Sequence, residues 1–598
     1  MSHSKDTLVH VTHEAVCKVG GIGAVLQGFF TSQPYLDAIG RSILVGPIFD
    51  LNQAGSQRLG DEGEVFYSSL DGICDSKYNQ EFEMIESFFG TNIVYGTKRF
   101  FDSRTGVGSD VEVLLINPFR AYEGHVDHFK KRMYEQFGIE SDRYEKIWEC
   151  EQYVRIAPVA IAALKEIGVS GEKSMIIAHE FMGMPAVLAA KLDCTAEFRT
   201  AFYAHEVATM RLLTEKNPGH DTMFYNSLER GLERGVCVNE VFGDQSWYFK
   251  HAYVDAAKYC DVICAVGDYV SQELRFMGAE FENSNINIVY NGIPSYQISV
   301  EEKISSRNRL KQYCENLLGY RPDSIFTHVT RLVTSKGLWR DLEILKHIDK
   351  RFGDTGQSGV YFLLSTQVSQ RPTADILGME KEYGWPVAHR ESWPDLSGGE
   401  AEFYTKVQQF NAVSRNIKAV FINQFGFDRS RCGVRMPEDM CEMDIRSGSD
   451  VEFGLSIYEP FGIAQLEPLT FGGLCVITNV CGCAGFVKRV TGGREFENIL
   501  IADYTKIDHE AAVSFERAIE IGRDQREEVE EAVSAELSSK ICSLLTEDRD
   551  AIAERIQNGY QVANEMSWDA VIENYVLKAL GVRKTHRAVT KDFSLSIN

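Results

Sequence analysis

The sequence predicts an α/β protein made of two doubly wound, Rossmann-like domains that face a shared cleft. Short strands that are apolar throughout alternate with helical stretches, as in SILVGPI (42–48), SMIIAHE (174–180), TAFYAHE (200–206) and DVICAVG (261–267). Such strands belong to parallel sheets, because helices cover both faces of the sheet. A second series of the same kind begins after NIVYNGIPS (287–295).

The second series predicts a second parallel sheet. Its strands are SIFTHVTRL (324–332), VYFLLSTQ (360–367), KAVFINQF (418–425), DVEFGLSIY (450–458) and LCVITNV (474–480). We therefore expect an N-terminal domain at 1–295, a C-terminal domain at 296–563, and a C-terminal helix and tail at 564–598. Residues 368–415 are polar and rich in Pro, Gly and charge, which predicts an insertion or irregular loop.

Composition excludes several classes of partner. With 62 Lys+Arg against 86 Asp+Glu, the net charge is −24, so the average surface repels nucleic acid and anionic membrane. The start, MSHSKDTLVH, lacks the features of a secretory signal, which predicts a cytoplasmic protein. The 14 cysteines include no CxxC pair, so neither a disulfide framework nor a zinc site is indicated. The sequence leaves homo-oligomerisation open.

The first motif is VCKVGGIGAV (16–25), which follows the apolar stretch TLVHVTHEA. Glycines between a strand and a helix let the backbone approach a phosphate or a sugar closely, and the helix N-terminus offers free N–H groups. Lys18 would add a positive charge beside them. The alternative is a tight turn whose glycines are only structural.

The second motif is RLVTSKG (331–337), in which Arg331 and Lys336 flank a strand-to-helix turn. Two cations at this spacing can close on one diphosphate, Arg through its planar fork and Lys as a point charge. The alternative is a solvated basic turn.

The third motif is SIYEPFGIAQLEPLTFGG (456–473). We expect Glu459 in the loop after a strand, accepting hydrogen bonds from sugar hydroxyls, and Glu467 one to two turns into the next helix, holding a ribose. Gly462 would let the backbone approach phosphate, and Pro468 should disturb the helix. Two glutamates that only decorate a helix face fit less well, because the segment is mostly apolar.

With these motifs the chain resembles the retaining glycosyltransferases of GT-B fold, and most closely the glycogen and starch synthases. The matching stretches are KVGGIG (18–23), AHE (178–180), YAHE (203–206), RLVTSKG, YEPFGIAQLEPL (458–469) and SWDAVIENYVLKAL (567–580). The resemblance implies a GT-B fold whose C-terminal helix crosses back to the N-terminal domain. It also implies transfer of glucose from a nucleoside-diphosphate glucose, such as UDP-glucose or ADP-glucose, to an α-1,4-glucan, with no metal or other cofactor.

The resemblance also implies a site drawn from both domains. Its catalytic residues would be His205, Arg331, Lys336 and Glu459. Its donor-binding residues would be Lys18, Gly20, Gly21, Gly462, Ile463 and Glu467, and its acceptor side would include Glu14, His179 and Glu180. For His179 and His205 the alternative is a core histidine satisfied by the backbone.

Two departures from the family pattern leave the substrates open. RLVTSKG has the spacing of the bacterial and plant synthases, whereas Glu467 is commoner in animal and fungal synthases and in enzymes that make sucrose, trehalose or mannosides. A UDP, ADP or GDP donor, a small acceptor, a sugar phosphorylase and a sugar-binding protein without turnover all stay alternatives. Candidate glycan-stacking aromatics are Trp385, Trp393 and FMGMP (181–185).

Overall fold

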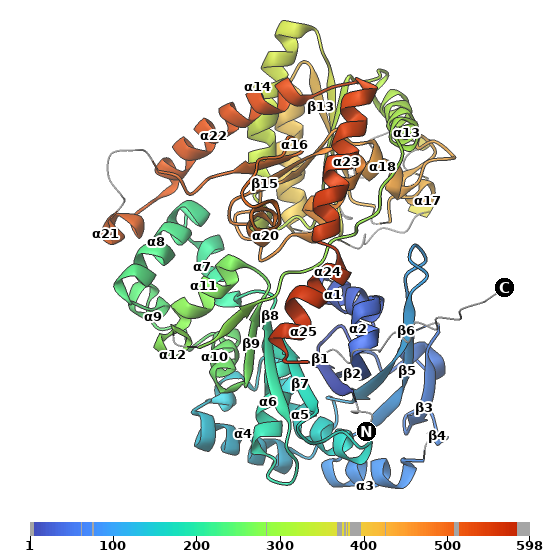
Figure 1. Cartoon of the computed structure of the whole chain (residues 1–598), viewed down its shortest axis with the longest axis vertical. Helices are drawn as coiled ribbons and strands as arrows, with labels where there is room; N and C mark the ends of the chain where they lie inside the picture. Colours follow the sequence, from blue (N-terminus) through green and yellow to red (C-terminus); the bar gives the residue numbers. More distant parts are fainter. Residues whose placement is uncertain are drawn as a thin grey trace, which may run out of the picture.

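The computed structural model places two sheets one above the other, joined by long connections (Figure 1). It describes residues 5–582 except 19, 61, 75–76, 283, 368–373, 376–377, 379–380, 383–395, 397, 425 and 508–513. Trp385 and Trp393 lie outside the described residues. No described helix has the length and apolar character that a membrane span requires.

The first sheet has the strand order β10-β9-β8-β7-β1-β2-β6-β5-β3-β4. Its strands are β1 (Asp6–Val11), β2 (Ile39–Pro47), β3 (Glu64–Ser68), β4 (Ile73–Cys74), β5 (Ile93–Phe101), β6 (Gly108–Ile116), β7 (Ser174–His179), β8 (Arg199–Ala204), β9 (Val262–Ala265) and β10 (Ile286–Ile288). The strands from β10 to β6 pair in parallel, as expected, whereas β5, β3 and β4 extend the sheet antiparallel. The turn between β5 and β6 is too short for a parallel crossover, so these strands form a hairpin.

Helices cover both faces of this sheet (Figure 1). They are α1 (Gly21–Phe30), α2 (Gln33–Ala38), α3 (Asn79–Phe89), α4 (Glu123–Phe137), α5 (Trp148–Glu166), α6 (Glu180–Leu192), α7 (Ala208–Lys216), α8 (His220–Arg234), α9 (Val238–Phe242), α10 (Phe249–Asp255), α11 (Asp268–Met277) and α12 (Ala279–Glu282). The strand order reverses direction between β1 and β7, so the loops after these two strands meet at one place.

The second sheet is wholly parallel, with the order β13-β12-β11-β14-β15-β16. Its strands are β11 (Ser324–Thr330), β12 (Gly359–Ser365), β13 (Ile417–Ile422), β14 (Val451–Gly454), β15 (Leu474–Thr478) and β16 (Ile499–Ala502). The direction of the order reverses between β11 and β14. The second motif directly follows β11 and the third motif follows β14, so the two motifs are neighbours in space.

The helices around the second sheet include one inside the expected insertion. They are α13 (Val300–Leu318), α14 (Trp339–Thr355), α16 (Gly398–Val413), α17 (Arg429–Cys432), α18 (Glu442–Gly448), α19 (Ile463–Leu466), α20 (Gly482–Thr491), α21 (Phe515–Ala518), α22 (Arg523–Leu544) and α23 (Arg549–Glu565). The expectation of an irregular 368–415 is therefore wrong for its last part. Phe403, Val407 and Phe410 form one buried face of α16, which packs as the crossover between β12 and β13.

The C-terminal segment crosses back to the first sheet, which confirms the expected GT-B arrangement (Figure 1). It forms α24 (Trp568–Val571), a π-helical turn (Ile572–Val576) and α25 (Leu577–Ala579). Trp568 packs edge-on against Phe29, and a Cβ on Gly28 would lie 2.2 Å from its ring. The Ser32 hydroxyl donates to Asp569 at 2.6 Å. The boundaries at 295 and 563 stay predictions.

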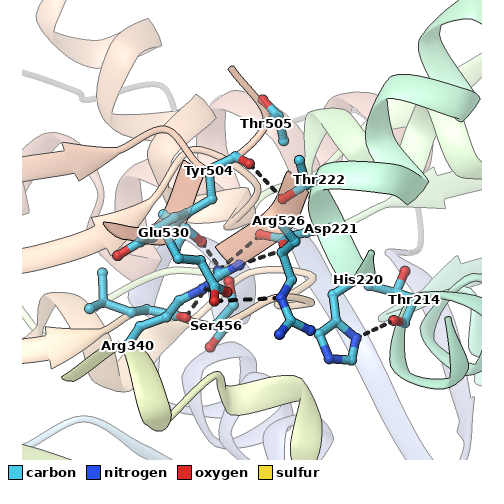
Figure 2. A network of polar contacts seen from close by, with 12 residues as sticks. Thr214, His220, Asp221, Thr222, Arg340, Ser456, Tyr504, Thr505, Arg526 and Glu530 are labelled. Carbon is cyan, nitrogen blue, oxygen red and sulfur yellow. Dashed lines mark hydrogen bonds and ion pairs between the residues drawn. The ribbon is translucent and has the colours of Figure 1, made fainter. Parts of the chain in front are cut away.

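A buried ion cluster joins the helices of the two sheets (Figure 2). Arg340 of α14 donates to both carboxylate oxygens of Asp221 in α8, at 2.6 and 2.9 Å, and its Nε donates to Glu530 of α22 at 2.8 Å. Arg340 and Asp221 are both fully buried. Burial raises the pKa of Asp221 although Arg340 opposes it, and the carboxylates of Asp221 and Glu530 outweigh burial to raise the pKa of Arg340.

Further polar contacts surround this cluster. The Thr222 hydroxyl donates to the carbonyl of Tyr504 at 2.8 Å, and the Arg340 guanidinium lies 3.8 Å from the centre of the Tyr504 ring. Arg526 donates to the carbonyl of Pro218 at 2.7 Å. The cluster therefore fixes α8 against α14 and α22 at the edge of the space between the sheets.

Replacing Arg340 with leucine should destabilise the protein strongly. The change would leave Asp221 buried without its guanidinium, which costs about 3–5 kcal/mol, whereas Glu530 would keep Arg526 and the Trp339 indole as partners. Denaturant-induced unfolding measures the loss. The matched control is Arg321→Ala, since Arg321 and Glu315 form an exposed pair whose loss should cost less than about 1 kcal/mol. Equal losses in the two variants would contradict a structural role for the cluster.

Candidate active site

The carboxyl ends of the central strands of both sheets border one cleft of about 2180 Å³. Every site residue predicted from the sequence lines it except His179. The lining members are Glu14, Lys18, Gly20, Gly21, Glu180, His205, Arg331, Lys336, Glu459, Gly462, Ile463 and Glu467. Motifs that are more than 400 positions apart in the sequence therefore share one cavity.

The glycine motif is the turn from β1 into α1. Gly20 is the N-cap residue, and its N–H donates to Glu14 Oε2 at 2.7 Å. A Cβ on Gly23 would lie 2.5 Å from the same carboxylate, so this glycine is structural. Above Gly21 the space is open, and no side chain caps α1. The glycines of the turn therefore serve both expected roles: Gly23 allows tight packing behind the turn, and the first N–H groups of α1 are left for the cleft.

Lys18 adds a positive charge to this turn. Its side chain is exposed in the cleft wall. Within the part of the chain that the structure describes, its ammonium makes no ion pair. It is therefore available to a ligand.

Glu180 sits in a strained position directly after β7. Its φ is +65°, which is unusual for a residue with a side chain. Its Oε1 accepts hydrogen bonds from the backbone N–H groups of His205 and, at 2.7 Å, Glu206, whereas Oε2 is buried and has no partner among the described residues. Burial raises the pKa of Glu180 to about 8. The carboxyl group is therefore mostly protonated at neutral pH and can donate a hydrogen bond.

His205 follows β8 and forms part of the cleft wall, and His179 lies directly behind it. The Nδ1 atom of His179 is 2.8 Å from Nε2 of His205. Burial lowers the pKa of His205 to about 3 and that of His179 well below its usual value, so both rings are neutral. His179 is thus a core histidine, as the alternative held, but its partners are side chains rather than the backbone.

The second motif follows β11 at the opposite wall. Arg331 is exposed in the cleft and, among the described residues, makes no ion pair. Lys336 ends a 3₁₀ turn (Thr334–Lys336) and donates to the Glu459 carboxylate. Gly337 has φ +59°, and a Cβ there would lie 2.3 Å from the carbonyl of Leu455. The close approach of the two loops therefore requires a glycine at this position.

The third motif follows β14. Helix α19 lasts one turn, and Glu467 begins a 3₁₀ helix (Glu467–Phe471), so the expected disturbance by Pro468 is confirmed. Gly462 precedes α19 with φ +92°, a conformation that other residues adopt only with strain. The Glu467 carboxylate projects into the cleft, where Nη1 of Arg446 lies 3.0 Å from Oε2.

Sequence analysis missed Arg446, which stands in MCEMDIRSGSD without a recognisable motif. It also missed Arg211 and Lys250, two cations in the cleft wall, and His220, whose φ of +43° places it beside Trp339. None of these residues belongs to a motif with a recognisable spacing. Each lies on a helix, and the packing of that helix decides which of its side chains face the cleft. His220 is the first residue of α8 and adjoins the ion cluster (Figure 2).

One further sequence candidate falls away from the cleft chemistry, and the Asp-x-Asp at 548–550 serves a helix end. The stretch FMGMP (181–185) is buried in α6, so it offers no exposed stacking surface, although Phe181 and Met182 reach the cleft wall. Asp548, in the Asp-x-Asp of the C-terminal region, caps α23 by accepting from the N–H of Ala551 at 2.9 Å. The described residues contain no cluster of His, Cys, Asp and Glu that could hold a metal.

No protein-family model and no curated protein sequence matches the chain. Solved structures do match. A trehalose-6-phosphate synthase aligns over 97% of this chain and 100% of its own, with a TM-score of 0.50 and 12% identity. An α,α-trehalose 6-phosphate synthase from Burkholderia multivorans covers 97% of both chains (TM-score 0.49, 9% identity).

The catalytic domain of starch synthase IV from Arabidopsis thaliana, bound to ADP and acarbose, covers 94% of this chain and 99% of its own (TM-score 0.46, 16% identity). The match with a TM-score of 0.50 is to a trehalose-6-phosphate synthase, so the expected particular likeness to glycogen and starch synthases is not shown. At this identity the likeness shows the fold: the chain has the GT-B fold of retaining glycosyltransferases.

The buried histidines should make the protein less stable in mild acid. The folded state keeps His10, His179 and His205 neutral, whereas the unfolded chain takes up protons as pH falls below 6.5. Their stabilising contribution is therefore complete above pH 6.5 and is lost toward about pH 3, by up to about 1.4 kcal/mol per pH unit for each ring. Glu180, whose pKa is raised, acts in the opposite direction between pH 4.5 and about 8 and offsets one ring.

Urea unfolding midpoints at a series of pH values measure this loss. His10→Asn should flatten the decline between about pH 6.5 and pH 5, because one proton fewer is taken up on unfolding. The control is His128→Asn, since His128 is exposed on α4. A decline of the same slope in wild type and His10→Asn would contradict the neutral state of this ring.

Proposed function

We propose that the chain is a retaining glycosyltransferase that moves glucose from a nucleoside-diphosphate glucose to the non-reducing end of an α-1,4-glucan. One observation carries the proposal. Arg331, which makes no ion pair with the described residues, and the bonded pair Lys336–Glu459 stand at the switch point of the second sheet, in the same cleft as His205 and the open α1 N-terminus. This combination joins a diphosphate site and a sugar site in one cavity.

The donor would lie against the second sheet. Arg331 and Lys336 supply the positive charge for the diphosphate, and the glycine at 462 lets backbone N–H groups of α19 approach it. Glu467, held by Arg446, would accept both hydroxyls of the ribose. Glu459, oriented by Lys336, would hold the hydroxyls of the glucose.

The reaction follows from where charge develops. The bond between the anomeric carbon and the diphosphate oxygen breaks first, its electron pair stays on the phosphate, and the sugar becomes oxocarbenium-like. Arg331 and Lys336 stabilise the departing diphosphate. The acceptor hydroxyl attacks from the same face and passes its proton to the departing phosphate oxygen. The configuration is retained, and the step requires no protein nucleophile and no metal.

The charge of the opposite wall favours a neutral acceptor. Among the described residues of the first half, the cleft is lined by the mostly protonated Glu180, by four further glutamates, Glu14, Glu149, Glu206 and Glu215, and by three cations, Lys18, Arg211 and Lys250. A phosphorylated sugar would meet this acidic surplus unfavourably. The cleft of about 2180 Å³ also exceeds the roughly 300–1,000 Å³ of most small-ligand sites, which leaves room for a chain end beside the donor.

Labelled UDP-, ADP- and GDP-glucose, each incubated with the protein and glycogen, test the proposal. We expect label that precipitates with the polymer and an α-configured product by NMR. Label confined to a di- or trisaccharide would replace the glucan by a small acceptor. Phosphate-dependent release of glucose 1-phosphate would indicate a phosphorylase. Donor binding without transfer to any acceptor would indicate a binding protein.

Replacing Arg331 with alanine should lower kcat by about 10²–10³ without loss of fold, because one charge at the departing diphosphate is removed. Arg331 is the cleaner choice than Lys336, since Lys336→Ala would also leave Glu459 without its cation. The control is Lys346→Ala, which removes an exposed cation from the same cleft wall. Wild-type turnover in Arg331→Ala, or an equal loss in both variants, would refute the assignment of the diphosphate site.

A further inference from the structure

A chain of hydrogen bonds runs from the cleft through the interior of the first sheet. It links His205 to His179, His179 to His10, His10 to Tyr35, and Tyr35 to Ser42. The contacts are His205 Nε2 to His179 Nδ1 at 2.8 Å, His179 Nε2 to His10 Nδ1 at 2.9 Å, His10 Nε2 to Tyr35 Oη at 3.1 Å, and Tyr35 Oη to Ser42 Oγ at 2.9 Å.

The packing holds these rings in one arrangement. His10, His179 and Tyr35 are fully buried; His10 lies in β1 and His179 in β7, and His205 directly follows the neighbouring strand β8. The rings of His179 and His205 stack with centroids 5.1 Å apart and planes at 16°, and those of His10 and His179 at 5.2 Å and 29°. Turning one ring would therefore break two contacts.

Burial keeps the rings uncharged. It lowers the pKa of His10 and of His205 to about 3, and that of His179 well below its usual value. A neutral imidazole has one N–H donor and one acceptor nitrogen. The proton positions of the three rings are therefore coupled, because each ring that accepts on one nitrogen must donate from the other.

Tyr35 sets the direction of this coupling. An imidazole nitrogen is a much stronger base than a phenol oxygen, so Tyr35 donates its O–H to Nε2 of His10 and accepts from the Ser42 hydroxyl. His10 then donates from Nδ1 to His179, and His179 donates from Nδ1 to Nε2 of His205. The proton of His205 is left on Nδ1, which makes no hydrogen bond with the rest of the described chain.

We propose that Tyr35, His10 and His179 are positioning residues that hold His205 as the Nδ1–H tautomer and so present a hydrogen-bond donor to the sugar in the cleft. The inference rests on the proposed function. It adds to that function the residues that fix the tautomer of His205. In this tautomer, Nδ1 of His205 donates a hydrogen bond to a sugar hydroxyl oxygen and cannot accept one. A buried partner sets the tautomer of a catalytic histidine in the same way in other enzymes.

The test compares His10→Leu with His10→Asn. Leucine removes the donor to His179, whereas the asparagine amide can donate from nearly the same position as Nδ1. Nitrogen-15 NMR of histidine-labelled protein reports the tautomer, and the His205→Gln variant identifies the His205 signals. We expect Nδ1–H in the wild type and in His10→Asn, and a shift toward Nε2–H in His10→Leu.

Turnover should follow the tautomer. We expect kcat to fall about 10- to 100-fold in His10→Leu, and by no more than about threefold in His10→Asn. The thermal shift caused by saturating nucleoside-diphosphate glucose should be unchanged in both variants. If His10→Leu does not fold, Tyr35→Phe removes only the phenol oxygen and should shift the His205 tautomer in the same direction.

Three results would overturn the proposal: a wild-type His205 that carries its proton on Nε2, a tautomer that does not change in His10→Leu or Tyr35→Phe, or a changed tautomer with unchanged turnover. The NMR measurement needs no substrate. Absence of transfer from every donor would therefore refute the proposed function, while the tautomer of His205 would still show whether the chain of hydrogen bonds acts as inferred.

Discussion

The arrangement of the site depends on the buried contact of Arg340 with Asp221 and Glu530. The cleft is formed between two sheets, so its geometry exists only while the helices of one sheet stay fixed against those of the other. Apolar packing would tolerate sliding of these helices, whereas a bidentate ion pair holds two oxygens at 2.6 and 2.9 Å from one guanidinium. Asp221 lies in the first turn of α8, where the helix dipole also favours its charge.

Within each sheet, the reversal of strand order brings the functional loops together. The loops after β1 and β7 meet in the first sheet, and those after β11 and β14 meet in the second. Backbone strain is concentrated at these places: Glu180 has φ +65° and Gly462 has φ +92°. Glu180 is the first residue of α6 and Gly462 is the N-cap of α19, and both line the cleft, so the strained backbone lies in the cleft wall.

The two walls handle charge differently. On the second sheet, exposed or half-exposed cations face a carboxylate, as expected where a diphosphate must be bound and released. On the first sheet, burial removes the charge of the groups directly after β7 and β8: Glu180 is mostly protonated near neutral pH, and His179 and His205 are neutral. Neutral hydrogen-bond donors and acceptors suit a sugar, whereas cations suit a phosphate.

The sequence by itself determined the fold class, most of the parallel strands and the three motifs, because buried parallel strands are apolar throughout and glycines mark the turns that follow them. All of the site residues that it predicted line the cleft, except His179. Tertiary structure alone decided the antiparallel edge of the first sheet, the helical nature of 398–413, and the placement of Arg446 against Glu467. It likewise decided that His179 stands behind His205 and that His10 continues the chain inward. These contacts join residues far apart in the sequence, and no local spacing records them, because pairing across strands and helices is set by packing.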